Sequence, residues 1–191
     1  LSRGLGDVYK RQILGSLQRL VSLLEQNGFD YMIIGGYALP FYGRIRATID
    51  IDVAVAVRGI KEREAFLDLL TANDFEVGAG GAYIQNPVIT VVDKKDGIEM
   101  EIWFKPDGVV FDKEALKRRR KGSLMSSFDA WIISPEDFIV NKLARADRGA
   151  TDEEDVKSVL VLQEKKLDEK YLEKRAKAAG VLNILKSIES A

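Results

Sequence analysis

The residues best suited to chemistry are a pair of glycines followed, after thirteen intervening residues, by two aspartates. Gly35-Gly36 precede Asp50-Ile51-Asp52. On a β-strand, residues two apart point to the same face, so the two carboxylates would be neighbours. Two bare anions at that spacing repel each other and favour a divalent cation. Adjacent glycines let backbone amides approach an anionic group closely. The pattern predicts a triphosphate cradle beside a magnesium site.

Each half of this pattern has a simpler interpretation. An Asp-x-Asp alone often marks a solvated strand face, and Gly-Gly alone is usually a turn. The combination favours function, because a strand, a glycine turn, a short helix and a second strand would bring both acids to one side.

A third carboxylate lies on a later strand. In residues 98–104, Glu99 and Glu101 share one face, opposite Ile98, Met100 and Ile102. If this strand pairs beside residues 49–57, one of the two glutamates lies next to the aspartates. Three acids suit an in-line nucleotidyl transfer, in which two hold the metal ions and the third takes a proton from the attacking hydroxyl. The alternative is that both glutamates lie on the solvent-exposed face of an antiparallel hairpin.

Composition excludes several other chemistries. The 191 residues carry a net charge of −1, with 46% hydrophobic and 31% charged residues and neither His nor Cys. These absences exclude Ser-His-Asp and Cys-His catalysis, thiolate zinc sites and disulfides. A bound metal must therefore be a hard cation held by oxygen, Mg²⁺ or Mn²⁺.

The chain also lacks the features of a membrane or secreted protein. The longest apolar run falls far short of the roughly 18–20 residues that span a bilayer. Residues 1–12 (LSRGLGDVYKRQ) have no apolar core typical of a secretory signal and no clear amphipathic period. They resemble translated adaptor sequence, and we expect them to be a non-native leader. We expect the protein to be cytoplasmic.

Periodicity predicts the elements that must position these acids. The spacing of apolar residues favours strands at 31–34, 49–57, 88–92, 98–104 and 130–133, and a hairpin turn through Asp96-Gly97. A helical turn is expected at 35–43, and helices at 13–27, 60–72, 112–121, 136–146, 152–163, 168–178 and 181–188. The predicted organisation is an α/β core over 13–133, followed by a helical segment of the same domain over 134–191.

The motif resembles the signature of minimal nucleotidyltransferases of the DNA polymerase β superfamily. That signature is a glycine pair, a spacer, Asp-x-Asp and a third acid, here Gly35-Gly36, Asp50, Asp52 and Glu101. A Glu departs from the family's usual Asp at the third position. Arg46-Ala47-Thr48-Ile49-Asp50-Ile51-Asp52 resembles the Arg-x-Thr-x-Asp-x-Asp variant of the AbiEii-like, toxin-type branch.

The resemblance extends into the helical half of the chain. Lys142-Leu143 resembles the branch's helix ending in Lys-Leu. Residues 152–155 resemble its Asp-Leu-x-Asp motif, with Glu153 in place of Leu. By resemblance, Lys142 reaches the nucleotide phosphates and Asp155 supports the site. Without it, Lys142 is an exposed helix lysine and Asp155 a first-turn acid favoured by the helix dipole.

The resemblance implies a polymerase β-like fold with a small mixed sheet and a metal-dependent transfer of NMP from an NTP. Asp50, Asp52 and Glu101 are the expected catalytic and metal-binding residues. The expected nucleotide-binding residues are Gly35, Gly36, Arg46, Thr48, Lys142 and Asp155. The toxin-type branch implies an RNA end such as tRNA, or a protein, as acceptor, and a cognate antitoxin or toxin partner. The alternatives are an antibiotic-type transferase with a small acceptor and a non-catalytic, antitoxin-like nucleotide-binding module.

Two further clusters have weaker interpretations. The cationic run at residues 117–121 could grip a polynucleotide through its phosphates, although such runs are usually solvated helix faces. Trp103, Phe104 and Trp131 fit the core or the wall of a pocket better than a base-stacking platform.

Overall fold

Seven strands form one mixed sheet in the part of the chain that the structure describes, in the order β3-β4-β5-β2-β1-β7-β6. The structure is a computed structural model, and it describes residues 2–46, 48, 50–82, 85–124 and 127–190. The strands are β1 (Tyr31–Ile34), β2 (Asp52–Val55), β3 (Phe75–Val77), β4 (Val88–Asp93), β5 (Ile98–Trp103), β6 (Arg120–Leu124) and β7 (Phe128–Ile132).

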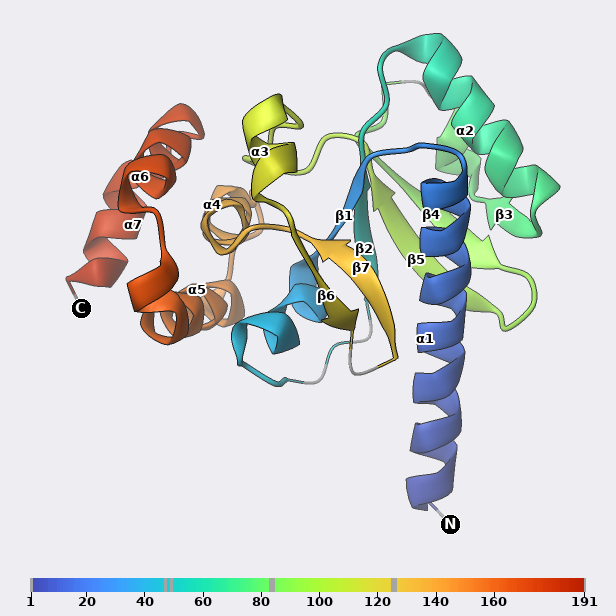
Figure 1. Cartoon of the computed structure of the whole chain (residues 1–191), viewed down its shortest axis with the longest axis horizontal. Coiled ribbons are helices and arrows are strands. Elements are labelled where there is room, and N and C mark those ends of the chain that lie inside the picture. Colours follow the sequence, from blue (N-terminus) through green and yellow to red (C-terminus); the bar gives the residue numbers. More distant parts are fainter. Residues whose placement is uncertain (1, 47, 49, 83–84, 125–126, 191) are drawn as a thin grey trace.

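Helices cover both faces of this sheet (Figure 1). The α-helices are α1 (Ser2–Gln26), α2 (Ile60–Ala72), α3 (Lys113–Arg118), α4 (Pro135–Ala144), α5 (Ala150–Gln163), α6 (Glu169–Ala178) and α7 (Leu182–Glu189). Three short 3₁₀ turns accompany them, η1 (Gly35–Tyr42), η2 (Ala79–Ala82) and η3 (Glu164–Lys166). The expected mixed α/β architecture with a helical C-terminal segment is confirmed.

The two-residue period of the central strands divides the core into two clusters. In β1, Tyr31 and Ile33 pack in the cluster that contains α1 and α2. Met32 and Ile34 pack in the cluster that contains α4, α5, α6 and α7. Because β1 is buried on both faces, its sequence is a short continuous apolar run rather than an alternating one.

Helix α1 begins earlier than its amphipathic pattern predicts. Leu17, Leu20 and Leu24 are fully buried against the sheet, as expected for the helix predicted at 13–27. The helix nevertheless starts at Ser2, and residues 6–11 are exposed where it projects past the sheet (Figure 1). Those residues need no apolar stripe, because they pack on nothing there. None of the described helices, α1 included, is long and apolar enough to cross a bilayer.

The predicted strand at 49–57 is too long. Strand β2 contains only Asp52–Val55, and Ile49 lies outside the described residues. Its antiparallel register with β1 runs from Tyr31 opposite Val55 to Ile34 opposite Asp52. Beyond Ile34 the chain turns into η1, so β1 offers no strand partner to the residues before Asp52.

The basic helix predicted at 112–121 is also wrong in its second half. Helix α3 ends at Arg118, and Arg120 begins β6, which pairs antiparallel with β7 at the sheet edge. The guanidinium of Arg119 donates to the Tyr31 carbonyl oxygen and to Asp30. These hydrogen bonds hold the residue between α3 and β6 against the start of β1. Strand β6 (RKGSL) carries no alternating apolar pattern, and β3 (FEV) is only three residues long, so both strands depend on pairing with a neighbour.

The helical segment starts as its sequence predicts. The Ser134 hydroxyl accepts from the Asp137 amide at 3.0 Å, and Pro135 occupies the first helical position. Helices α4 and α5 then pack on the sheet face that carries Ala54 and Trp103. This arrangement places the helical segment against the face of β2 on which Asp52 lies.

Burial of α1 predicts two different effects on stability. Leu17→Ala should lower the free energy of unfolding by about 2–5 kcal/mol, because Leu17 is fully buried. Removing residues 1–12 should change it by less than about 0.5 kcal/mol, because residues 6–11 are exposed. Urea unfolding of both variants measures this. An equal loss from both changes would contradict the packing described for α1.

Candidate active site

Sheet register places Asp52 next to Glu101. Asp52 is the first residue of β2, and in the parallel pairing of β2 with β5 its partner is Glu101. The Glu101 amide donates to the Ile51 carbonyl oxygen at 2.8 Å and fixes this register. Glu99 lies opposite Val92 of β4 and is exposed. Of the two glutamates that the sequence left open, the structure therefore brings Glu101 to Asp52.

The two carboxyl groups share an unfavourable environment. Burial raises the pKa of Asp52, while a hydrogen bond from the Trp103 indole Nε1 to Oδ1, 3.2 Å away, works in the opposite direction. Burial raises the pKa of Glu101 as well, and the negative charge of Asp52 raises it further. Glu101 is hydrogen-bonded to Asp52, and Asp50 adds a repulsive charge to both.

Asp50 differs from the other two acids in its exposure. It precedes β2 and is exposed, whereas Asp52 and Glu101 are partly covered. Across the described part of the chain, no three acidic side chains converge closely enough to enclose a metal ion by themselves. The donor set still suits Mg²⁺ in its chemistry, because it consists of carboxylate oxygens whose mutual repulsion a cation would relieve.

The glycine pair lets two side chains of the site pack against the turn. Gly35 has φ +62°, and a Cβ there would lie 2.0 Å from Asp52 Oδ2. A Cβ on Gly36 would lie 2.5 Å from Thr48 Oγ1. Both glycines are thus required by close approach, and Gly35 also by its left-handed backbone. The sequence predicted this freedom for an approach to phosphate, and the structure shows that Asp52 and Thr48 use it.

Lys142 does not lie on an exposed helix face. It is buried in α4, with Nζ 2.9 Å from Asp152 Oδ1 and 3.3 Å from Asp155 Oδ2. The fully buried Asp155 also accepts from Arg46, with Oδ1 3.2 Å from Nε and Oδ2 3.2 Å from Nη2. This buried ion cluster connects the segment before Asp50 to α4 and α5.

A cavity of about 30 Å³ joins the acid pair to the ion cluster. Its lining residues come from the ends of β1, β2 and β5, the start of η1, the loop after β5, and the C-terminal end of α4. They are Ile34, Gly35, Asp52, Trp103, Asp107, Asn141, Lys142 and Arg145. Lys142 thus faces both its carboxylate partners and the cavity of Asp52. The predicted residues Gly35, Asp52 and Lys142 meet here although they are far apart in the sequence.

Sequence reasoning did not assign Asn141, Arg145 or Asp107 to the site. Arg145 follows Lys142 by three positions and therefore shares its helix face, a signal that was available from periodicity. Asn141 is held by a hydrogen bond from Nδ2 to the Asp107 carbonyl oxygen at 2.8 Å, a contact that only the tertiary structure creates. Trp103, expected in the core or a pocket wall, lines the cavity.

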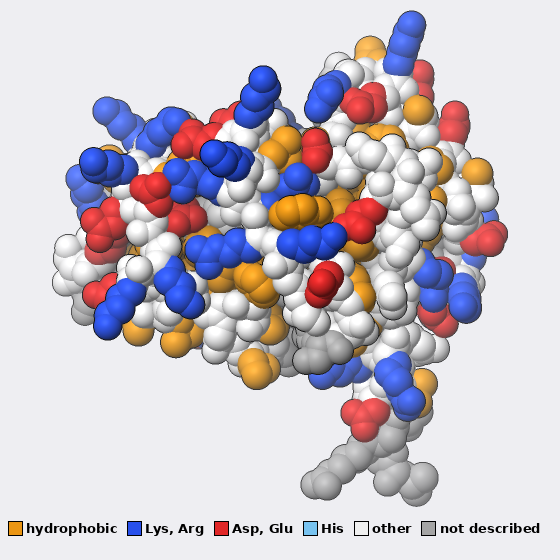
Figure 2. Space-filling view, in the orientation of Figure 1, with side chains coloured by type: hydrophobic (Ala, Val, Ile, Leu, Met, Phe, Trp, Pro, Cys, Tyr) orange, Lys and Arg blue, Asp and Glu red, His pale blue; other side chains and the backbone are white. Residues whose placement is uncertain are grey.

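The cationic run at 117–121 is engaged within the chain. Arg118 pairs with Asp168, Arg119 with Asp30, and Lys121 with Glu25. Arg119 and Lys121 also lie over the Trp131 ring. On this side of the molecule, Lys and Arg side chains alternate with Asp and Glu (Figure 2). The run does not form a continuous basic stripe, because its charges are divided between α3 and β6.

Comparison with known proteins agrees with this architecture. The family model described as "Nucleotidyl transferase of unknown function (DUF2204)" matches residues 13–183. No curated protein matches the sequence significantly.

Solved structures similar to this chain have low sequence identity to it. A lincomycin-bound lincosamide antibiotic adenylyltransferase, LnuA, superposes with a TM-score of 0.53 at 15% identity, over 78% of this chain and 96% of that one. The antibiotic-resistance factor ANT(2'')-Ia gives 0.52 at 14%, over 92% and 96%. An antigenic nucleotidyltransferase-like protein from Paracoccidioides brasiliensis gives 0.51 at 19%, over 94% and 92%. The likeness shows a nucleotidyltransferase fold.

The contact between Gly35 and Asp52 predicts that a side chain at position 35 destabilises the fold by more than the left-handed backbone alone would. Gly35→Ala should lower the free energy of unfolding by more than Gly28→Ala, which should cost about 1–2 kcal/mol. Gly28 has φ +72° and open space where a Cβ would lie, with nothing within 4 Å, whereas Gly35→Ala must also displace Asp52. Urea unfolding compares the two variants. Equal losses would contradict the contact between Gly35 and Asp52.

Repulsion at Asp52 predicts a pH-dependent gain in stability. Asp52→Asn should raise the free energy of unfolding by about 0.5–2 kcal/mol at pH 7. The folded pKa of Asp52 lies above its ordinary 3.8, so the ionised carboxyl destabilises the fold above the folded pKa. This cost fades as pH falls through the folded pKa towards 3.8, where the advantage of the variant should vanish.

Urea unfolding at a series of pH values tests this dependence. Glu99→Gln on the exposed side of β5 is the control, and it should change stability by less than about 0.5 kcal/mol at every pH. A gain from Asp52→Asn that persisted unchanged in acid would be inconsistent with the charge repulsion.

Proposed function

Because this chain belongs to the nucleotidyl transferase family DUF2204, we propose that it moves the NMP of an NTP to an acceptor hydroxyl and releases pyrophosphate. The observation that carries the proposal is the placement of Asp52 beside Glu101, at a cavity that Gly35 and Lys142 also line. Paired acids, a glycine turn and a cation at one point are what a triphosphate and a metal together require.

The acids have distinct roles in this proposal. Asp50, Asp52 and Glu101 would hold Mg²⁺ or Mn²⁺, which neutralises charge on the phosphates when bound. Glu101 is placed to accept the proton of the attacking hydroxyl, because it lies beside Asp52 on the adjacent strand. The acceptor oxygen bonds to the α-phosphorus, the bond to the bridging oxygen breaks, and pyrophosphate leaves.

The cations act on the triphosphate. Lys142 lines the cavity of Asp52 and provides a point charge suited to phosphate oxygens. Arg46, Thr48 and the amides of the glycine pair complete the nucleotide-binding set. Asp155 contacts no part of that cavity and acts by positioning Lys142 and Arg46, both of which it pairs with.

Two acceptor classes follow from different observations. The Arg46–Asp52 motif resembles the AbiEii-like branch, which favours an RNA end or a protein hydroxyl as acceptor and implies a cognate antitoxin or toxin partner. A small hydroxylated molecule is the second candidate. It is favoured by the engagement of residues 118–121 in contacts within the chain, and by the likeness in fold to an antibiotic adenylyltransferase and an antibiotic-resistance factor.

The test is transfer of label from each α-labelled NTP, with magnesium, to total RNA, bulk protein or an aminoglycoside. Glu101→Gln should lower the rate at least about 100-fold, because the variant loses both an anionic ligand and the proton acceptor. Glu99→Gln is the matched control and should stay within about twofold, since Glu99 points to solvent on the same strand.

The Asp50→Ala, Asp52→Ala double variant tests the metal-binding pair. Label that enters one acceptor pool and is lost in this variant identifies both the reaction and the acceptor. Substantial transfer by the double variant would overturn the proposed site. Tight NTP binding with no transfer to any pool would favour the non-catalytic nucleotide-binding module.

A further inference from the structure

Helix α5 is apolar on two sides, although only one of them faces the core. Val156 and Val159 are fully buried beneath the helix. On the opposite side, Val161 is 75% exposed, and Leu160 is half-buried between it and the core side. Leu160 and Val161 therefore extend the apolar surface of α5 from its core side toward solvent.

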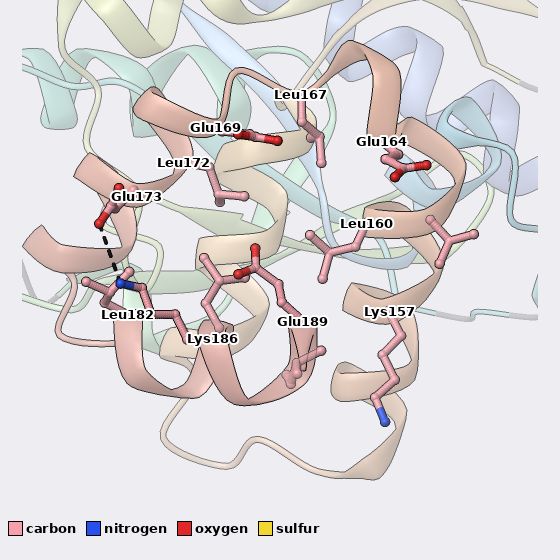
Figure 3. Close-up of a pocket in the computed structure, with 13 residues that line it drawn as sticks. Lys157, Leu160, Glu164, Leu167, Glu169, Leu172, Glu173, Leu182, Lys186 and Glu189 are labelled. Atoms are coloured by element: carbon pink, nitrogen blue, oxygen red, sulfur yellow. Dashed lines mark ion pairs between the residues drawn. The ribbon is translucent and has the colours of Figure 1, made fainter. Parts of the chain in front are cut away.

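This outer side opens onto a groove of about 750 Å³ between α5, η3, α6 and α7. Leu160, Leu167 and Leu172 point toward one another across it (Figure 3). Leu182, Leu185 and Ile188 from the α7 side complete its apolar floor. Of the described residues, none lines both this groove and the cavity at Asp52, so the two sites are separate.

The rim of the groove is negatively charged. Its charged residues are Glu164, Glu169, Glu173, Glu189, Lys157 and Lys186. Lys186 lies 3.7 Å from Glu173, and this ion pair offsets one negative charge. Lys157 points away from the three leucines in Figure 3, whereas Glu189 extends toward the floor. The rim thus presents an excess of carboxylates around an apolar centre, which favours a ligand that is both apolar and cationic.

Among ligands that are both apolar and cationic, the shape of the groove favours an α-helix. The walls of the groove are themselves helices, and an amphipathic helix fits between helices with apolar anchors every three or four residues. Val161 lines the groove at its α5 wall and is 75% exposed, so the apolar surface is open to solvent there and does not enclose a small ligand. An elongated ligand covers the floor and Val161 together.

We propose that the groove between α5, α6 and α7 docks the apolar face of a basic amphipathic helix from a partner protein. The leucine floor takes the apolar anchors, and Glu164, Glu169 and Glu189 face the Lys or Arg residues that flank them. This inference is independent of the transfer reaction, because it uses none of the residues at Asp52.

The probe is a fluorescein-labelled synthetic helix of Leu and Lys, about 18 residues or five turns long, with Leu along one face. Its binding to the full chain is followed by fluorescence anisotropy at several salt concentrations. A peptide with Glu in place of every Lys is the comparison. The Lys peptide should bind at least about tenfold more tightly than the Glu peptide, and its binding should weaken with salt.

Two variants of the protein separate docking from general charge attraction. Glu164→Lys with Glu189→Lys should weaken binding about tenfold. Both positions are at helix C-termini, where Lys is favoured by the helix dipole, so this variant should stay folded. Val161→Gln should weaken binding through lost apolar contact. Glu64→Lys on α2 is the matched control, because Glu64 is exposed far from the groove in sequence, and it should leave binding within about twofold.

Three results would overturn the proposal. The first is equal binding of the Lys and Glu peptides. The second is binding that the Glu164→Lys, Glu189→Lys variant leaves unchanged, with circular dichroism showing that the variant is folded. The third is a concentration-dependent dimer, seen by sedimentation, that Val161→Gln abolishes, because a second copy would then cover the groove.

Discussion

The parallel pairing of β2 with β5 forces two carboxyl groups together, and much of the surrounding structure serves to tolerate this. Asp52 and Glu101 are register partners on adjacent strands, so neither can move away without breaking the sheet. Their pKa values are raised because burial and mutual repulsion disfavour the charged forms. The apolar clusters on both faces of the sheet provide the stability that such an arrangement costs. A cation bound between the two carboxylates would relieve this repulsion.

The burial of Asp155 is a second constraint, and it ties the helical segment to the acid-bearing part of the sheet. A fully buried carboxylate requires partners, and Asp155 has Lys142 on one side and Arg46 on the other. Arg46 belongs to the segment that leads to Asp50, while Lys142 lines the cavity of Asp52. Through one residue, α4, α5 and the acid-bearing segment are therefore held in a common arrangement. Removing Lys142 or Arg46 would take one counter-charge from the buried Asp155.

The same helices have an opposite side with a different character. Helices α5, α6 and α7 bury one set of apolar residues against the sheet and leave a second set around an open groove with an acidic rim. The ion cluster and the groove share helix α5, whose first turns carry Asp152 and Asp155 and whose last turns carry Leu160 and Val161. A helix bound in the groove would thus contact the element that supports the ion cluster.

The sequence by itself determined the elements whose periodicity is strong and local. The buried run at 31–34, the hairpin around Asp96-Gly97 and the Ser134-Pro135 helix start are all encoded by neighbouring residues. The glycine pair and the Asp-x-Asp motif also indicated Gly35 and Asp52, which the fold brings into contact. Only the tertiary structure decided what depends on distant partners. It shortened β2 because β1 ends at Ile34, and it made Arg120 a strand residue because β7 pairs with it. The tertiary structure also places Glu101, rather than Glu99, beside Asp52, and it buries Lys142 next to two aspartates. Local spacing cannot encode such choices, because register and burial depend on which segments meet when the chain folds.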